Sequence, residues 1–188
     1  SPDEKTLYFS SDMPGTKGMS DIYKVAILDD GTFGTPVNLG DKINTEARET
    51  FPFISNKNEL YFASTGWSGF GGLDIFKSEM KSKVMYVTPK NLGKDINSNM
   101  DDFAITFNEN NLSGYFSSNR SGGKGDDDIY YFEDKTPKPK LVNIFLNVIT
   151  KEKQEASLFY QPIVKTTNWL LPFFADWLEE VKGEVVNS

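Results

Sequence analysis

Short apolar and aromatic runs, separated by turn-forming residues, recur from residue 1 to residue 134. In the clearest unit, a turn at 56–58 and a glycine-rich stretch at 65–73 separate these runs. Short runs bounded by Gly, Pro, Asn and Ser predict β-strands. No segment of this region keeps the i, i+3, i+4 apolar spacing of an amphipathic helix, so we expect an all-β structure. The predicted strands of the unit are Phe51–Ser55, Leu60–Ser64, Asp74–Glu79 and a weaker fourth strand that follows Tyr86–Thr88.

The pattern repeats at a spacing of 53 positions. Leu7-Tyr8-Phe9 returns as Leu60-Tyr61-Phe62, and fourteen positions are identical at this one offset, where ordinary composition predicts about three. The other identical pairs are Ser11 and Ser64, Gly18 and Gly71, Asp21-Ile22 and Asp74-Ile75, Lys24 and Lys77, Pro36 and Pro89, Asn38-Leu39-Gly40 and Asn91-Leu92-Gly93, and Ile43-Asn44 and Ile96-Asn97. Four short strands in each unit of about 40–55 residues are typical of a β-propeller blade.

A third copy begins one residue late, at a further offset of 54. We expect the extra residue in a turn near Asn110–Leu112, because turns tolerate insertions. The pattern stops after Glu133, so the region 1–134 is predicted to be a partial β-propeller of about two and a half repeats. The matching residues of the third copy are Tyr115-Phe116, Ser118, Gly125 and Asp128-Ile129-Tyr130.

The second strand of the unit is apolar on both of its faces, at Leu60, Tyr61 and Phe62. Such a strand suits a position sandwiched between two neighbouring sheets. The fourth strand is weaker and carries a proline, as an outer edge strand can.

One motif, Ser-x6-Gly-x2-Asp, occurs in all three copies. The loop that contains the motif is glycine-rich, so we expect that its backbone can take positive φ. We expect the aspartate that closes the loop to accept hydrogen bonds from loop N–H groups and from the serine hydroxyl. Recurrence in every copy favours a structural role over a catalytic one, since an active site is needed only once. The motif residues are Ser11, Gly18 and Asp21, then Ser64, Gly71 and Asp74, then Ser118, Gly125 and Asp128.

Leu7–Asp12, Asp21–Tyr23 and above all Gly114–Tyr130 carry a family resemblance. These runs resemble the WD40-like propeller repeat of the TolB type. With Asp101-Asp102-Phe103 before it, the last run is similar to the final blade of OmpA-family outer-membrane proteins of Bacteroidota-like bacteria. The resemblance covers about residues 1–134.

The resemblance implies a periplasmic propeller associated with the outer membrane, followed by a small β-sandwich and a peptidoglycan-binding OmpA domain. Some members of that family are linked to type IX secretion and gliding. The chain carries no OmpA domain, so peptidoglycan binding transfers to none of its residues. Because Ser1 falls inside a repeat, we expect a fragment of a longer protein.

Composition narrows the possible functions. The chain has no histidine and no cysteine, which excludes Ser-His and Cys-His catalysis, His or Cys metal ligands and disulfides. Its net charge of −7 disfavours nucleic acid and anionic membrane surfaces as partners, since these need an excess of Lys and Arg. No apolar window reaches the roughly 18 residues of a membrane span, so we expect no direct membrane insertion. No cofactor is predicted.

Two carboxylate clusters have an alternative chemical interpretation. Asp126–Asp128, with Asn119 and Glu133, offers oxygen ligands for calcium. The run lacks the alternating spacing of an EF-hand loop and Asp128 already has the motif role, so a solvated acidic loop is the default interpretation. Paired carboxylates at Asp101-Asp102 and at Glu46 and Glu49 suggest a glycosidase, but they precede core strands. We therefore predict no metal site and no enzymatic activity.

The loop Gly66–Gly72 carries two large aromatic residues, Trp67 and Phe70. Turn chemistry does not require both, and exposed aromatics often anchor interfaces. The alternative is that they fold back over the edge of the sheet.

Residues 135–140 are predicted to be a stiff linker, with Thr136–Lys140 rich in Pro and Lys. Leu141–Thr150 is β-rich, either as an outer strand or as the start of another domain. An amphipathic helix is expected from Asn168 or Pro172 to Gly183, and the fold of 141–188 is otherwise open. Its apolar face would hold Phe173, Phe174, Trp177, Leu178 and Val181.

The leading hypothesis is a non-enzymatic interaction or scaffolding propeller that binds envelope proteins in the periplasm. The alternative is a propeller that directs substrates to a protease or hydrolase domain outside this sequence, as in some TolB-type proteins.

Overall fold

A computed structural model describes residues 1–82, 85–135, 141–142 and 163–164. The chain divides into two compact units, Ser1–Lys135 and Thr136–Ser188. In the second unit, β12 (Leu141–Val142) pairs antiparallel with β13 (Ile163–Val164). The linker predicted at 136–140 and the helix predicted after Asn168 lie outside the described residues.

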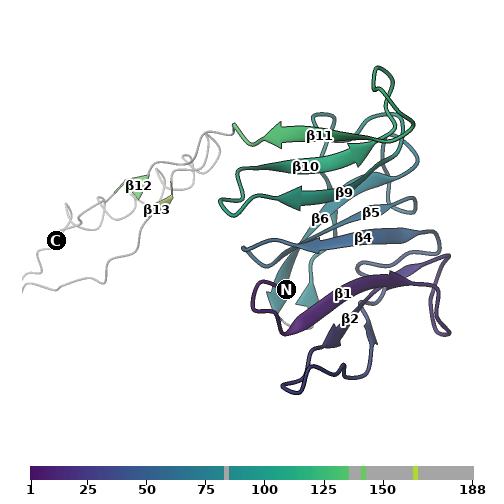
Figure 1. Ribbon diagram of the computed structural model, residues 1–188, viewed down its shortest axis with the longest axis vertical. Helices are drawn as coiled ribbons and strands as arrows, with labels where there is room; N and C mark the ends of the chain where they lie inside the picture. The colour runs from purple at the N-terminus through teal and green to yellow at the C-terminus, as the bar shows by residue number, and fades with distance from the viewer. Residues whose placement is uncertain (83–84, 136–140, 143–162, 165–188) are drawn as a thin grey trace, which may run out of the picture. The chain divides into compact units, whose positions relative to one another are not determined.

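The described part of the first unit is all-β and forms three antiparallel sheets that follow one another in a row (Figure 1). The first sheet holds β1 (Thr6–Ser11), β2 (Asp21–Ala26) and β3 (Val37–Asn38). The second holds β4 (Glu49–Ile54), β5 (Glu59–Ser64), β6 (Asp74–Ser82), β7 (Met85–Tyr86) and β8 (Lys90–Asn91). The third holds β9 (Asp102–Phe107), β10 (Ser113–Ser118) and β11 (Asp128–Glu133).

The end of the second sheet differs from the sequence expectation. β6 runs on to Ser82 and pairs with β7, so Tyr86 belongs to an extension of the β6 hairpin and not to the approach to a fourth strand. The fourth strand is β8, which directly follows Pro89 and pairs with Phe76 and Lys77 of β6. Both β3 and β8 are two residues long and follow a proline, as edge strands do.

The extra residue of the third copy lies where the sequence places it. β4 and β5 are joined by residues 55–58, whereas β9 and β10 are joined by residues 108–112. Asn58 and Asn111 both adopt positive φ, at 58° and 53°, a conformation that asparagine tolerates well.

The first strands of the second and third sheets share a distortion that the sequence did not predict. Phe51 and Ala104, 53 positions apart, have φ of 51° and 54°. The register of β4 with β5 and of β9 with β10 shifts at these points. Such a β-bulge bends the strand and increases its twist locally.

Two hydrophobic cores lie between the sheets. Ile22 of the first sheet packs with Leu60 and Phe62 of the second. On the other side of the second sheet, Tyr61 and Ile75 pack against residues of the third, including Ile105 and Phe116. The alternating side chains of β5 are therefore buried on both faces, as its apolar run predicts.

Backbone hydrogen bonds join the glycine-rich loops of the first and second sheets to the first strand of the next sheet. The Glu49 N–H donates to the Ser20 carbonyl at 2.9 Å, and the equivalent Asp102 N–H donates to the Leu73 carbonyl at 2.7 Å. In the first of these junctions the Met19 N–H also donates to the Ala47 carbonyl at 2.7 Å. The sheets are thus joined through main-chain groups as well as through apolar packing.

The motif glycines serve these junctions, whereas the positive φ expected of the glycine-rich loops is found at other glycines, Gly15 at 97° and Gly122 at 94°. None of Gly18, Gly71 and Gly125 is among the residues with positive φ. A Cβ on Gly18 would overlap the Ala47 carbonyl oxygen, and a Cβ on Gly71 would overlap the Met100 carbonyl oxygen. Glycine is needed at these two positions because the backbone of the next sheet approaches too closely for any side chain.

Gly71→Ala is expected to lower the free energy of unfolding by about 2–3 kcal/mol, because the added methyl group forces the loop away from Met100. Gly125→Ala is the matched control, since a Cβ there meets only ordinary contacts at 3.6 and 3.9 Å. It should change stability by less than about 0.5 kcal/mol. Urea unfolding of the full chain measures both, and equal losses would contradict the inter-sheet role of Gly71.

Candidate functional site

The three motif aspartates close the loops between the paired strands, and the first two of them are buried. Asp21 accepts from the N–H groups of Lys17 at 2.8 Å and Gly18 at 3.3 Å. Asp74 and Asp128 accept at one carboxylate oxygen from the N–H groups three and four residues before them, at 2.7–3.1 Å. These bonds hold each loop in one conformation.

The motif serines do not bond the aspartates, contrary to expectation. Each serine lies opposite its aspartate in the strand register, but its hydroxyl turns toward the start of its own loop. There it accepts from the N–H two residues later, at 2.9–3.1 Å. The serine therefore fixes the beginning of the loop and the aspartate fixes its end. The bonded pairs are Ser11 with Met13, Ser64 with Gly66, and Ser118 with Arg120.

Two asparagines to which the sequence analysis gave no role bind the backbone of the strands that begin with the motif aspartates, β2 and β6. The Asn44 side-chain amide accepts from the Ile22 N–H at 2.8 Å and donates to the Ile22 carbonyl at 3.1 Å. Asn97 makes the same pair of bonds to Ile75, at 2.8 and 2.9 Å. Both asparagines are buried. The repeated Ile-Asn dipeptide marks both asparagines in the sequence, but it does not reveal which backbone groups their side chains bind.

Glu49, one of the candidate catalytic carboxylates, is fully buried at the start of β4. It accepts hydrogen bonds from the Thr45 N–H and hydroxyl, both at 2.7 Å. The Ser64 hydroxyl donates to it at 2.6 Å. These bonds tie the connection before β4 to the second strand of the same sheet. Glu46, by contrast, is exposed.

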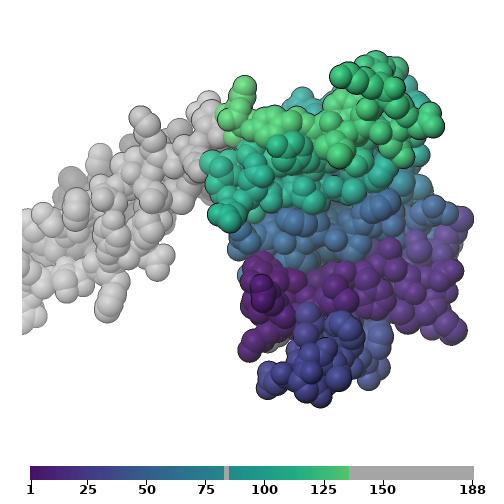
Figure 2. All heavy atoms as spheres, viewed as in Figure 1, coloured from purple at the N-terminus to yellow at the C-terminus, as the bar shows by residue number. Residues whose placement is uncertain are grey.

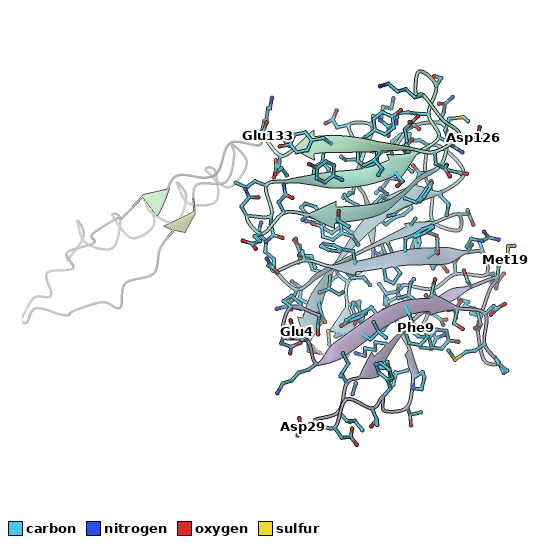
Figure 3. All side chains as sticks on the ribbon, in the orientation of Figure 1. Glu4, Phe9, Met19, Asp29, Asp126 and Glu133 are labelled. Atoms are coloured by element: carbon cyan, nitrogen blue, oxygen red, sulfur yellow. The ribbon has the colours of Figure 1, made fainter. Side chains whose placement is uncertain are left out.

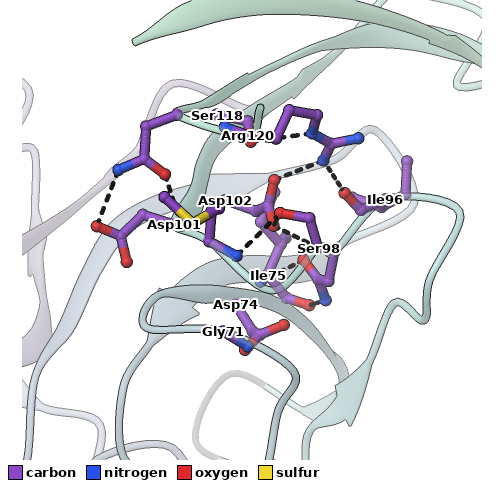
Figure 4. Close-up of polar contacts among 12 residues, drawn as sticks. Gly71, Asp74, Ile75, Ile96, Ser98, Asp101, Asp102, Ser118 and Arg120 are labelled. Atoms are coloured by element: carbon purple, nitrogen blue, oxygen red, sulfur yellow. Dashed lines mark hydrogen bonds and ion pairs between the residues drawn. The ribbon is translucent and has the colours of Figure 1, made fainter. Parts of the chain in front are cut away.

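Asp102 holds the equivalent place at the start of β9 and is also fully buried. It accepts from the Ser98 N–H and hydroxyl, and it pairs with the Arg120 guanidinium at 2.5 Å (Figure 4). The same guanidinium lies 4.8 Å from the ring centroids of Phe116 and Tyr130. Removal of the Arg120 charge would leave the fully buried Asp102 carboxylate without its counter-ion, which is costly.

Asp101 is also used within the junction between the second and third sheets. Its carboxylate accepts from the Leu73 N–H at 2.8 Å and from the Asn119 side-chain amide at 3.4 Å. Its own N–H donates to the Asn119 side-chain oxygen at 2.8 Å. Asp101, Asp102 and Glu49 are therefore all occupied by structural hydrogen bonds, which does not favour a glycosidase.

Trp67 folds back over the edge of its sheet. Its indole N–H donates to the Ile43 carbonyl at 2.9 Å, and its ring packs against the core between the first and second sheets. In the next junction, Arg120 donates to the Ile96 carbonyl, which is equivalent to that of Ile43. A tryptophan and an arginine thus make the same kind of contact with the preceding sheet.

Phe70, by contrast, is 44% exposed. The Lys94 ammonium lies 5.8 Å from the centroid of its ring, within cation–π range. Of the two aromatics predicted to contact a partner, Phe70 is the one that presents a large apolar surface to solvent.

The loops of the first and third sheets reach the same edge of the unit. Met19 and Asp126 mark this edge, whereas Glu4 and Glu133 lie at the opposite one (Figure 3). We call the former the loop edge. An open pocket of about 440 Å³ lies next to Trp67 and is lined by residues that include Lys17, Thr45 and Glu46.

The acidic loop of the third sheet has two exposed carboxylates, Asp126 and Asp127. Asp128 is engaged with the N–H groups of Lys124 and Gly125. Across the described residues, no three or more acidic, histidine or cysteine side chains are grouped so that they could share a metal ion.

Burial raises the pKa of Tyr61, and the neighbouring Glu59 carboxylate raises it further. Burial and a hydrogen bond with Tyr8 raise the pKa of Tyr86 in the same direction. Displaced pKa values often mark functional sites. Here both hydroxyls belong to side chains of the cores between sheets, and that packing accounts for the shifts.

Comparisons of the chain with protein-family models, curated proteins and solved structures gave no match. Within the described residues, no helix has the length and hydropathy needed to cross a bilayer.

Trp67→Ala is expected to lower the free energy of unfolding by about 3 kcal/mol, since it removes core packing and leaves the Ile43 carbonyl without its donor. Phe70→Ala, in the same loop, should change stability by less than about 0.5 kcal/mol because its ring is largely exposed. Thermal and urea unfolding of the two variants provide the comparison. A stable Trp67→Ala variant would mean that the indole is not part of the structural junction.

Proposed function

We propose that the chain is a non-enzymatic interaction or scaffolding module of the cell envelope, built from sheets of the β-propeller blade type. Its partners are envelope proteins, in the periplasm and close to the outer membrane. The loop edge, with Phe70 exposed on it, is the surface that contacts the partner.

The observation that carries this proposal is the use of the polar motif residues. Glu49, Asp74 and Asp102 accept hydrogen bonds from their own loop, from the connection before their strand or from their own sheet, and all three are buried. Carboxylates held in this way are not available to substrates. Large apolar side chains remain exposed instead, and such residues are typical of interaction surfaces.

The blade interpretation is supported by the order of the strands and by the packing of the sheets. In the second sheet, successive strands pair in chain order as β4, β5, β6, and a short outer strand then pairs with β6. The second sheet has a core on each face, as a blade between two neighbours would. The two-residue outer strands, each after a proline, also suit a blade rim.

Site-specific photo-cross-linking in native cells tests the proposed function. A benzophenone amino acid at Phe70 should give a discrete adduct with an envelope protein, because this ring faces solvent on the loop edge. The matched control places the same amino acid at Lys57, an exposed position in the turn between β4 and β5 of the same sheet. The control should give no discrete adduct.

A second variant separates loss of contact from loss of folding. Phe70→Ala should weaken recovery of the cross-linked partner at least tenfold while the melting temperature is unchanged. If Phe70 gives no more adduct than Lys57, or if the adduct is a cytoplasmic protein, the proposed function is wrong.

A further inference from the structure

The open pocket of about 440 Å³ beside Trp67 lies in the junction between the first and second sheets. Lys17 lines it from the loop between β1 and β2, Glu46 from the connection that precedes β4, and Trp67 from the loop between β5 and β6. In Figure 2 the purple atoms of β1 lie directly against the blue atoms of β4. Both walls of this pocket, which we call the Trp67 pocket, therefore belong to described residues.

Most polar groups of the Trp67 pocket are already bonded. The Asn44 side chain and the Trp67 indole N–H are bonded to backbone groups. The Thr45 hydroxyl donates to a buried carboxylate at 2.7 Å. What remains available to a ligand is the half-buried ring of Trp67 and the charged side chains of the wall.

The charges of the Trp67 pocket do not balance. The Lys17 ammonium pairs with the Asp41 carboxylate at 3.1 Å. The exposed Glu46 carboxylate makes no hydrogen bond or ion pair within the part of the chain that the structure describes. One negative charge is therefore uncompensated in this pocket, on a chain whose net charge is −7. Such a site favours a positively charged group over an anion.

The second junction shows how this chain holds a cation at the equivalent place. There Arg120 stands in place of Trp67, and its guanidinium lies 4.8 Å from the ring centroids of Phe116 and Tyr130 and pairs with the Asp102 carboxylate. A planar guanidinium can stack on an aromatic ring and pair with a carboxylate at the same time. The Trp67 pocket offers a ring and a carboxylate, whereas no arginine is among the residues that line it.

We propose that the Trp67 pocket binds the guanidinium group of an arginine side chain on a partner protein, stacked on Trp67 and paired with Glu46. The second junction does not duplicate the site, because Asn99 stands at the position equivalent to Glu46. This inference rests on the proposed function, since it names the chemical group through which the partner binds the loop edge. Its test uses a small peptide in place of the partner.

NMR titration of the full chain with acetyl-Gly-Arg-Gly-amide tests the site. The chain has three tryptophans, and the assigned indole N–H resonance of Trp67 is the local reporter. This resonance should shift saturably with a Kd of roughly 1–10 mM, as one cation–π contact and one exposed ion pair would give. The same peptide with citrulline, which has the shape of arginine without its charge, should give no saturable shift.

Two variants that each remove one negative charge locate the contact. Glu46→Gln should weaken binding of the arginine peptide about fivefold. Its melting temperature should be unchanged, because the Glu46 carboxylate is bonded to no described residue. Asp127→Asn is the matched control, since it removes an exposed carboxylate from the loop of the third sheet. It should bind the peptide like the unmodified chain.

Four results would overturn the proposal. One is a Trp67 resonance that does not respond to the arginine peptide. A second is equal binding of the citrulline peptide. The third is an equal loss of binding in Glu46→Gln and Asp127→Asn, which would indicate a general attraction to an acidic chain. The last is saturation of the Trp67 resonance by N-acetylglucosamine at lower concentration than by the arginine peptide, which would make the pocket a carbohydrate site.

Cross-linking at Phe70 separates the failure of this proposal from the failure of the proposed function. A discrete envelope adduct at Phe70 without peptide binding would remove the arginine site and leave the proposed function intact. Peptide binding that depends on Glu46, without an adduct at Phe70, would retain the arginine site and remove the proposed function.

Discussion

The close backbone contact between one sheet and the next is the constraint on which the rest of the structure depends. A sheet of three or four short strands has two apolar faces and cannot bury both by itself. Burial of the Ile22 and Ile75 faces requires the next sheet to lie directly against the preceding loop. The N–H groups of Glu49 and Asp102 then reach carbonyl groups across the junction, and only glycine fits at positions 18 and 71. The buried carboxylates of the same two residues hold the start of each new strand in place.

Much of this organisation could be predicted from the sequence. The 53-residue repeat located the hairpins, the extra residue of the third copy and the doubly buried strand β5, because strand patterns and turn residues act locally. The loop N–H bonds of Asp21, Asp74 and Asp128 also follow from spacing alone. The reason for Gly18 and Gly71 did not, because it depends on a neighbouring sheet that contributes its backbone and no recognisable side chain. Nor could the equivalence of Trp67 and Arg120 be predicted, since two chemically different residues reach the same carbonyl position in successive junctions.

These contacts change which residues are candidates for a functional role. Most residues that recur between the copies are buried in the junctions or bonded within the loops, so their recurrence reflects the architecture of the sheets. Positions whose exposure differs between equivalent places in the sheets are the better guide to function. Phe70 is exposed on the loop edge, and Ile129 and Phe33 are exposed where their equivalents Ile75 and Tyr86 are buried. The proposed scaffold therefore combines a repeated internal construction with exposed surfaces that do not recur among the three described sheets.

Amide hydrogen exchange in the intact protein tests the central claim, that the repeated polar residues are structural junctions between sheets, most directly. The amides of Gly71 and Asp102, which are bonded within and across the junction between the second and third sheets, should exchange only through global unfolding. The equivalent Gly125 amide lies in the loop of the third sheet, which no further sheet follows among the described residues. It should therefore exchange at least a hundredfold faster. Similar rates for Gly71, Asp102 and Gly125 would contradict the account.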